Sequence, residues 1–126
     1  MKGDYAMFKI KFYRDKKGRE PVRDYIVSLK TKNTKDSLVK LHKIQDYINL
    51  LSENGTQIGM PIVRHLEGDI WELRPMKDRI LFFTFEGEYI VFLSHFRKMT
   101  QKTPKMEIKK ADKCRKDFIE RSKEYE

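Results

Sequence analysis

The sequence predicts an α+β protein with an antiparallel sheet and helices packed on one face of that sheet. Two changes of hydrophobic period support this prediction. Residues 8–12 alternate apolar and polar, residues 20–54 repeat at helical spacing, and residues 70–96 return to aromatic and β-branched runs. The expected order is strand, helix, helix, three strands and helix, in one domain spanning residues 1–126.

The first helical segments follow the strand at residues 8–12 and a turn at residues 15–18. Pro21 stands in the first turn of a short helix, where proline is tolerated. Its apolar residues lie at i, i+4 and i+7: Val22, Ile26 and Leu29. A second helix is predicted from a longer stripe that Gly55 ends: Leu38, Leu41, Ile44, Ile48 and Leu51.

Three strands are predicted at residues 70–74, 79–85 and 89–96. The breaks between them are too short for crossover helices, so we expect an antiparallel meander, which a short strand at residues 62–63 would extend. Thr103 and Pro104 then indicate an N-cap and a first helical residue, with the helix continuing to about Arg121. Helices on one face would leave the other face open, and we expect function there.

The formal net charge of +9 is concentrated near the C-terminus. Residues 97–116 contain nine Lys or Arg against Glu107 and Asp112. Such a segment attracts nucleic acid, an acidic protein or an anionic membrane surface.

The sequence shows no sign of a membrane or a secretory route. No apolar run approaches the ~18 residues of a membrane span, and Met1–Asp4 lacks the apolar start of a leader. Cys114 is the only cysteine, so the chain cannot form an internal disulfide. A cytoplasmic protein without membrane contact is expected.

No cofactor is predicted. The sequence contains no glycine-rich phosphate loop. Its three histidines are far apart, and none has a His or Cys neighbour at metal-ligand spacing: His42, His65 and His95. Cys114 has lysine and arginine neighbours that would lower a thiol pKa, but without a base it is more typical of a small helix residue.

The strand at residues 70–74 carries the most informative polar residues. Alternation places Trp71 and Leu73 toward the helices and Glu72 and Arg74 on the other face. Arg79 opens the next strand, close to Arg74 in a hairpin. One interpretation is a set of exposed cross-strand ion pairs. The other is that both guanidinium groups converge on one phosphate, to which they donate paired hydrogen bonds.

The motifs WELRP (71–75), RILFF (79–83) and IVFLSHFRKMTQKTPKMEIKKA (90–111) resemble the HigB branch of the RelE-type toxins, a branch also described as phage-derived proteins. The resemblance covers nearly the whole chain. It implies a RelE-like fold and a ribosome-dependent endoribonuclease that cuts mRNA in the 30S A site. It also implies a cognate helix-turn-helix antitoxin, similar to HigA, that forms a hetero-oligomer with the toxin.

Carried over by position, the resemblance gives functional roles to Arg74, Arg79, Lys98 and Lys102. This chain departs from the family pattern at two positions. His95 is shifted by one residue, so it faces the other side of its strand, and Met99 stands where a second lysine is usual.

Metal-free RNA cleavage needs only the RNA's own 2′-hydroxyl as nucleophile. Arg74 and Arg79 would stabilise the charge of the transition state, and Glu72 or Lys98 would serve as the base. Flanking phosphates would lie along the basic segment, where the helix N-terminus adds to the cations. The RNA-binding candidates are His95, Arg97, Lys98, Lys102 and Lys105.

Three other interpretations remain open at this point. The same fold serves toxins that bind DNA gyrase and cleave nothing. The basic segment would also suffice for a nucleic-acid-binding module without catalysis. Finally, a lysine-rich helix can simply be a solvated surface.

Overall fold

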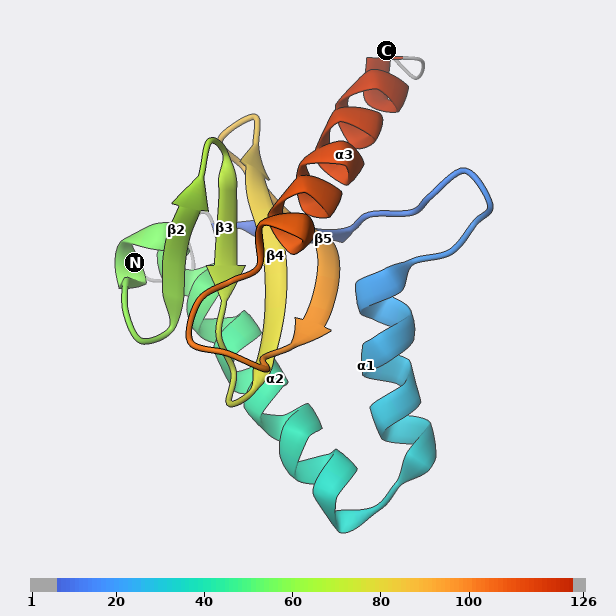
Figure 1. Cartoon of the computed structure of the whole chain (residues 1–126), viewed down its shortest axis with the longest axis vertical. Helices are drawn as coiled ribbons and strands as arrows, with labels where there is room; N and C mark the ends of the chain where they lie inside the picture. The colour runs from blue at the N-terminus through green and yellow to red at the C-terminus, as the bar shows by residue number, and fades with distance from the viewer. Residues whose placement is uncertain (1–6, 124–126) are drawn as a thin grey trace.

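The computed structural model describes residues 7–123. These residues form a five-stranded sheet with helices on both faces (Figure 1). Met1–Asp4, where we expect no leader, lies outside the described residues. The elements in chain order are β1 (Lys9–Phe12), α1 (Pro21–Lys32), α2 (Lys35–Asn54), the 3-10 helix η2 (Gly55–Ile58), β2 (Val63–Glu67), β3 (Ile70–Leu73), β4 (Asp78–Phe85), β5 (Tyr89–Arg97) and α3 (Lys105–Ser122).

The α+β class and the order of the elements are confirmed, and one pairing within the sheet differs from the prediction. The strand order is β1-β5-β4-β3-β2, and β2 to β5 form the expected antiparallel meander. However, β1 pairs parallel with β5, Ile10 opposite Ile90, so the sheet is mixed. The physical reason is that α1 and α2 carry the chain from one edge of the sheet to the other, so the first strand is left beside the last.

The prediction that the helices share one face is wrong, because α3 packs on the face opposite α1 and α2. The α1/α2 face holds a core that includes Ile44, Leu73 and Phe82. On the α3 face, Ala111 packs with Leu81 and other strand residues. The central strands allow this because β4 and β5 are buried in continuous runs rather than at alternate residues, which is typical of a sheet covered on both faces.

Local signals explain where the helices begin and end. Thr34 caps α2 by accepting a hydrogen bond from Ser37 N, and Ser37 Oγ accepts one from Thr34 N. Gly55 ends α2 with φ 67°, and a Cβ there would lie 2.6 Å from the Phe8 ring, so both conformation and space require glycine. In the described part of the chain, no helix is long and apolar enough to cross a membrane.

The start of α3 differs from the prediction in a way that matters for the site. Pro104 occupies the N-cap position and the helix begins at Lys105, so the Thr103 side chain does not cap the helix. The connection from β5 is tied to the β3–β4 turn by a hydrogen bond of 2.7 Å from Lys98 N to Lys77 O. Thr103 is thereby held against the α3 face of the sheet, where its hydroxyl contacts β2 and β3 side chains.

Candidate functional site

Three arginines surround one glutamate on the α3 face of the sheet. Arg64 Nη2, Arg74 Nε and Arg79 Nε lie 3.5, 3.3 and 4.0 Å from Glu72 Oε1. Glu72 and Leu81 are cross-strand partners, as are Glu72 and Arg64, so these side chains share a face. We call this group, Arg64, Glu72, Arg74 and Arg79, the arginine cluster. The sheet thus brings Arg74 and Arg79 together, as the hairpin predicts.

Glu72 is not the exposed carboxylate that the sequence suggests. Its side chain is 0% exposed, and its Oε2 accepts a hydrogen bond of 2.5 Å from Thr103 Oγ1. Thr103 in turn accepts a hydrogen bond of 3.1 Å from Arg64 Nη2. The difference arises because α3 and the loop before it cover this face. The interpretation as exposed ion pairs is therefore wrong for Glu72, and its carboxylate faces cations rather than solvent.

The three guanidinium groups differ in how far they reach solvent. The Arg64 side chain is 35% exposed and the Arg74 side chain 15%, whereas Arg79 is 7% exposed. Arg79 Nη1 donates to the carbonyl oxygens of Met76 and Asp78 at 2.8 and 2.9 Å. Burial, together with the neighbouring Arg74 charge, lowers the pKa of Arg79. Arg79 therefore holds the β3–β4 turn, and Arg64 and Arg74 form the accessible part of the cluster.

Several polar atoms of the α3 face have unused hydrogen-bonding capacity. Glu72 Oε1, Arg74 Nε and Ser94 Oγ are buried and form no hydrogen bond with the described residues. Arg74 Nε lies 3.3 Å from Glu72 Oε1, which is within ion-pair distance. The N–H group of Arg74 does not point at this oxygen well enough to form a hydrogen bond. Ser94 belongs to the same face, since it pairs with Leu81. Two of these atoms, Glu72 Oε1 and Arg74 Nε, belong to the arginine cluster, so part of the hydrogen-bonding capacity of the cluster is unused.

The predicted lysines continue this cationic surface along the β5–α3 connection. Lys98 is half-buried, whereas Lys102 and Lys105 are exposed. Between residues 7 and 123, none of the three lies within 4.0 Å of a carboxylate. Thr103 joins the connection to Glu72, so the lysines follow the arginine cluster in the chain and are anchored to it. The segment can therefore present unpaired positive charge to an anion.

His95 and Arg97 lie on the opposite face, apart from the arginine cluster. His95 Nε2 and Arg97 Nη1 lie 3.0 and 3.3 Å from Asp78 Oδ1, which also accepts a hydrogen bond of 2.8 Å from Tyr25 Oη. The Tyr25 and His95 rings stack at 3.6 Å. We call Tyr25, Asp78, His95 and Arg97 the aspartate cluster. The one-residue shift of His95 predicts this placement, and it separates His95 and Arg97 from the predicted RNA site.

The aspartate cluster is electrostatically satisfied. Burial disfavours the charged form of Asp78, but hydrogen bonds from His95 and Tyr25 outweigh burial and hold the Asp78 pKa below its usual range. Burial and the bond to Asp78 raise the pKa of Tyr25 to about 12, so its hydroxyl remains a donor. The cluster joins α1 to β4 and β5. Its chemistry is that of a structural link.

Sequence reasoning missed Arg64, Thr103 and Ser94 as members of the α3-face site. Arg64 lies in β2, for which the sequence gives only a weak strand signal, and the register that places it opposite Glu72 includes a bulge. Thr103 was missed because its position before Pro104 is typical of a helix cap.

Within the described range, no group of three His, Cys, Asp or Glu side chains is placed to hold a metal ion.

A comparison with protein families matches residues 24–116 to the family described as Phage derived protein Gp49-like (DUF891). The match runs from α1 into α3 and includes both clusters. The chain belongs to this Gp49-like family. The family is part of the RelE/HigB-like toxin superfamily and is associated with the toxins of toxin–antitoxin systems. A search of curated proteins found no match.

Proposed function

We propose that this Gp49-like protein is a HigB-type toxin that cleaves mRNA on the ribosome and thereby inhibits translation. The observation that carries the proposal is the arginine cluster, in which three guanidinium groups lie within 4.0 Å of one buried carboxylate oxygen. One carboxylate offsets only one of the three charges. The remaining positive charge suits a phosphodiester.

Arg64 and Arg74 are the groups that would contact the scissile phosphate, because they retain exposed surface. Negative charge builds on the phosphorane oxygens in the transition state, and fixed donors stabilise it by typically ~10²–10³ in rate each. Arg79 would contribute positive charge from its buried position, where it also holds the β3–β4 turn. The lysines of the β5–α3 connection would hold the flanking phosphates.

The proposed reaction needs no nucleophile from the protein. The 2′-oxygen attacks the adjacent phosphorus and the bond to the 5′-oxygen breaks, which leaves a 2′,3′-cyclic phosphate and a 5′-hydroxyl. Lys98, at the junction of β5 and the basic connection, is our candidate for the proton transfer: its neutral amine takes the proton from the 2′-hydroxyl, and the ammonium so formed gives that proton to the leaving 5′-oxygen.

Glu72 takes a different role in this proposal from the base considered in the sequence analysis. It is fully buried and already contacts Thr103 and the arginines, so it cannot approach a 2′-hydroxyl without breaking these contacts. We assign it as a positioning residue that fixes the directions of the guanidinium groups. A preorganised cluster does not have to reorganise during the reaction, which is the source of its catalytic effect.

Two further parts of the proposal concern partners. The substrate, mRNA in the 30S A site, places the protein in the cytoplasm. A cognate helix-turn-helix antitoxin, similar to HigA, would neutralise the toxin in a hetero-oligomer. The net charge of +9 supports an acidic surface on that partner, since complementary charge speeds association.

The test is to map cut sites on an mRNA under translation in a purified system. We expect wild-type protein to cut within the translated frame and Arg74→Ala to lower the cleavage rate by about 10²–10³. Binding of Arg74→Ala to RNA should change only a few-fold, because the lysines remain. Arg23→Ala, an exposed arginine of α1, is the matched control and should cut like wild type.

The outcomes separate the alternatives. Wild-type protein that binds RNA without cutting it under translation would leave a nucleic-acid-binding module. Growth arrest in cells with intact mRNA and inhibited gyrase would identify a gyrase inhibitor. Cleavage by Arg74→Ala at the wild-type rate would remove the arginine cluster from the mechanism.

A further inference from the structure

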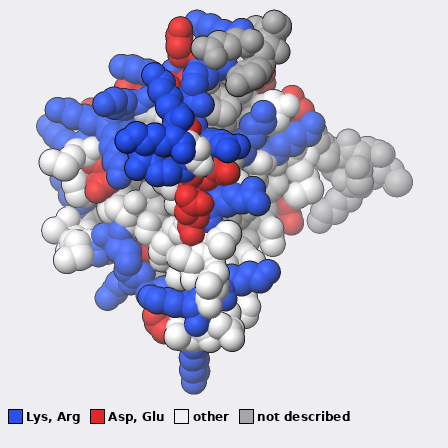
Figure 2. Space-filling view, turned by 90° about the vertical axis from the view of Figure 1, so that its right-hand side faces the viewer, with Lys and Arg blue, Asp and Glu red and all other residues white. Residues whose placement is uncertain are grey.

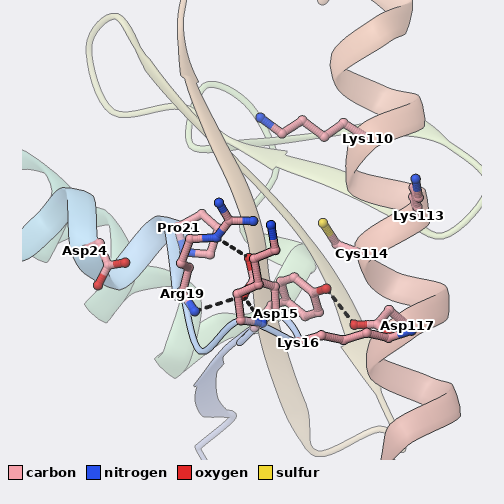
Figure 3. A pocket seen from close by; sticks show the side chains of 11 residues that line it. Asp15, Lys16, Arg19, Pro21, Asp24, Lys110, Lys113, Cys114 and Asp117 are labelled. Atoms are coloured by element: carbon pink, nitrogen blue, oxygen red, sulfur yellow. Dashed lines mark hydrogen bonds and ion pairs between the residues drawn. The ribbon is translucent and has the colours of Figure 1, made fainter.

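A pocket of about 670 Å³ lies between α3 and the loop that joins β1 to α1. It shares no residue with the arginine cluster. Figure 3 shows Lys110, Lys113 and Cys114 of α3 on one side, with Arg19 and Pro21 on the other. The full lining is Tyr13, Asp15, Lys16, Lys17, Arg19, Pro21, Asp24, Lys110, Lys113, Cys114 and Asp117.

The interior of this pocket is mostly apolar. Tyr13, Pro21 and Cys114 form part of its walls. Tyr13 donates its hydroxyl to Asp117 Oδ2 at 2.6 Å, so the polar end of the ring is already engaged. Burial raises the pKa of the Cys114 thiol, which keeps it neutral. The pocket volume falls within the range of small-ligand sites, and its walls suit a large apolar side chain.

The rim of the pocket is cationic. Figure 2 shows Lys and Arg gathered in the upper half of the side of the molecule that carries the β1–α1 loop. Of the three carboxylates in the lining, Asp15 pairs with Arg19 at 2.7 Å and Asp117 pairs with Arg121 at 2.8 Å. Four lysines have no carboxylate within 4.0 Å among the residues described: Lys16, Lys17, Lys110 and Lys113. The rim therefore carries unpaired positive charge around an apolar interior.

We propose that this pocket binds an acidic segment of a partner protein, which inserts one large apolar side chain between α3 and the loop. The carboxylates of the segment would lie against the four lysines, and charge complementarity would orient it. The apolar side chain would act as the anchor, since buried anchors provide most of the energy of such interfaces.

RNA fits the pocket less well than an acidic peptide. Tyr13 is the only aromatic residue in the lining and is 6% exposed, so it offers no open ring face on which a base can stack. Arg19, the only arginine, already pairs with Asp15. The inference rests on this pocket alone and does not depend on RNA cleavage.

The experiment uses the full chain and a fluorescent peptide with one tryptophan among glutamates and serines. We expect saturable binding in fluorescence anisotropy. Replacing the tryptophan by serine, or introducing Lys110→Glu with Lys113→Glu, should each weaken binding about tenfold. Lys30→Glu with Lys35→Glu is the matched control, because it changes the charge equally at the exposed α1–α2 corner, and it should bind like wild type.

A second measurement needs no variant of the pocket. Because Cys114 lines the pocket and is the only cysteine, bound peptide should slow its labelling by a thiol reagent. Equal binding of the peptide without tryptophan, or unchanged Cys114 labelling at saturating peptide, would overturn the proposal. Oligouridylate that binds more tightly than the peptide and is lost in the same double variant would overturn it in favour of a nucleic-acid surface.

Discussion

The arginine cluster and the aspartate cluster lie on opposite faces of the same sheet, and each is built around one buried carboxylate. Glu72 meets three permanent cations and leaves polar atoms unsatisfied. Asp78 meets a tyrosine, a histidine and one arginine, and the tyrosine and histidine also stack. The comparison shows two uses of a buried carboxylate. Glu72 holds more positive charge than it can neutralise, whereas the contacts of Asp78 connect a helix to the sheet.

The largest effect that we expect from this comparison is on Glu72. Glu72→Ala leaves three arginines without their shared carboxylate, and removing one partner from a buried charged group costs about 3–5 kcal/mol. Urea unfolding measures the loss. Glu72→Gln, which keeps the acceptor for Thr103, should lose less. An alanine variant as stable as wild type would mean that Glu72 does not organise the cluster.

Asp78→Asn should cost less, about 1–3 kcal/mol, because the amide oxygen can still accept from Tyr25 while the charged contacts are weakened. RNA cleavage should stay within a few-fold of wild type. Asp36→Asn, on the exposed α2 surface, is the control and should change stability little. If Asp78→Asn lost RNA cleavage while its stability stayed unchanged, the aspartate cluster would have a functional role and not a structural one.

The same variant has a pH signature. Because the Asp78 pKa is lowered in the folded state, its charge stabilises the fold above the unfolded pKa of about 3.9. That contribution is lost as the pH falls through the lower folded pKa. The stability difference between wild type and Asp78→Asn should therefore shrink as the pH falls below about 4. A difference that stays the same from pH 5 down to the acid unfolding of wild type would contradict this account.

The smallest effect concerns the lysines that extend the arginine cluster. Lys102→Ala should weaken binding to single-stranded RNA a few-fold and reduce the slope of log affinity against log salt by about 0.7, as expected for one lost phosphate contact. Lys35→Ala at the α1–α2 corner provides the control. A salt slope that does not change in Lys102→Ala would place this lysine outside the RNA path.

The comparison also explains how much the sequence reveals. Periodicity predicts the order of helices and strands, and strand alternation separates Glu72 from Trp71. His95 lies away from the arginines because of the register shift between β4 and β5, which alternation alone does not predict. The one-sided sheet that we predict conflicts with the continuous apolar runs of β4 and β5, which are typical of a sheet covered on both faces. Those runs were the available signal.

The remaining misses come from contacts between distant segments. The parallel pairing of β1 with β5 joins residues about 80 positions apart, and no local pattern encodes such a register. Arg64 enters the cluster through the β2–β3 register, and Thr103 enters through the path of a loop. Single residues in short elements carry little signal until the sheet has been assembled.

The position of Thr103 along the chain has a consequence for biosynthesis. Every strand precedes this threonine, which emerges from the ribosome after Glu72 and all three arginines have been translated. A nascent chain that stalls before residue 103 lacks the hydroxyl that locks the carboxylate in place, and α3 has not yet covered that face. Truncated products would therefore carry the cations without their finished geometry, so that only chains translated beyond this point would acquire the complete site.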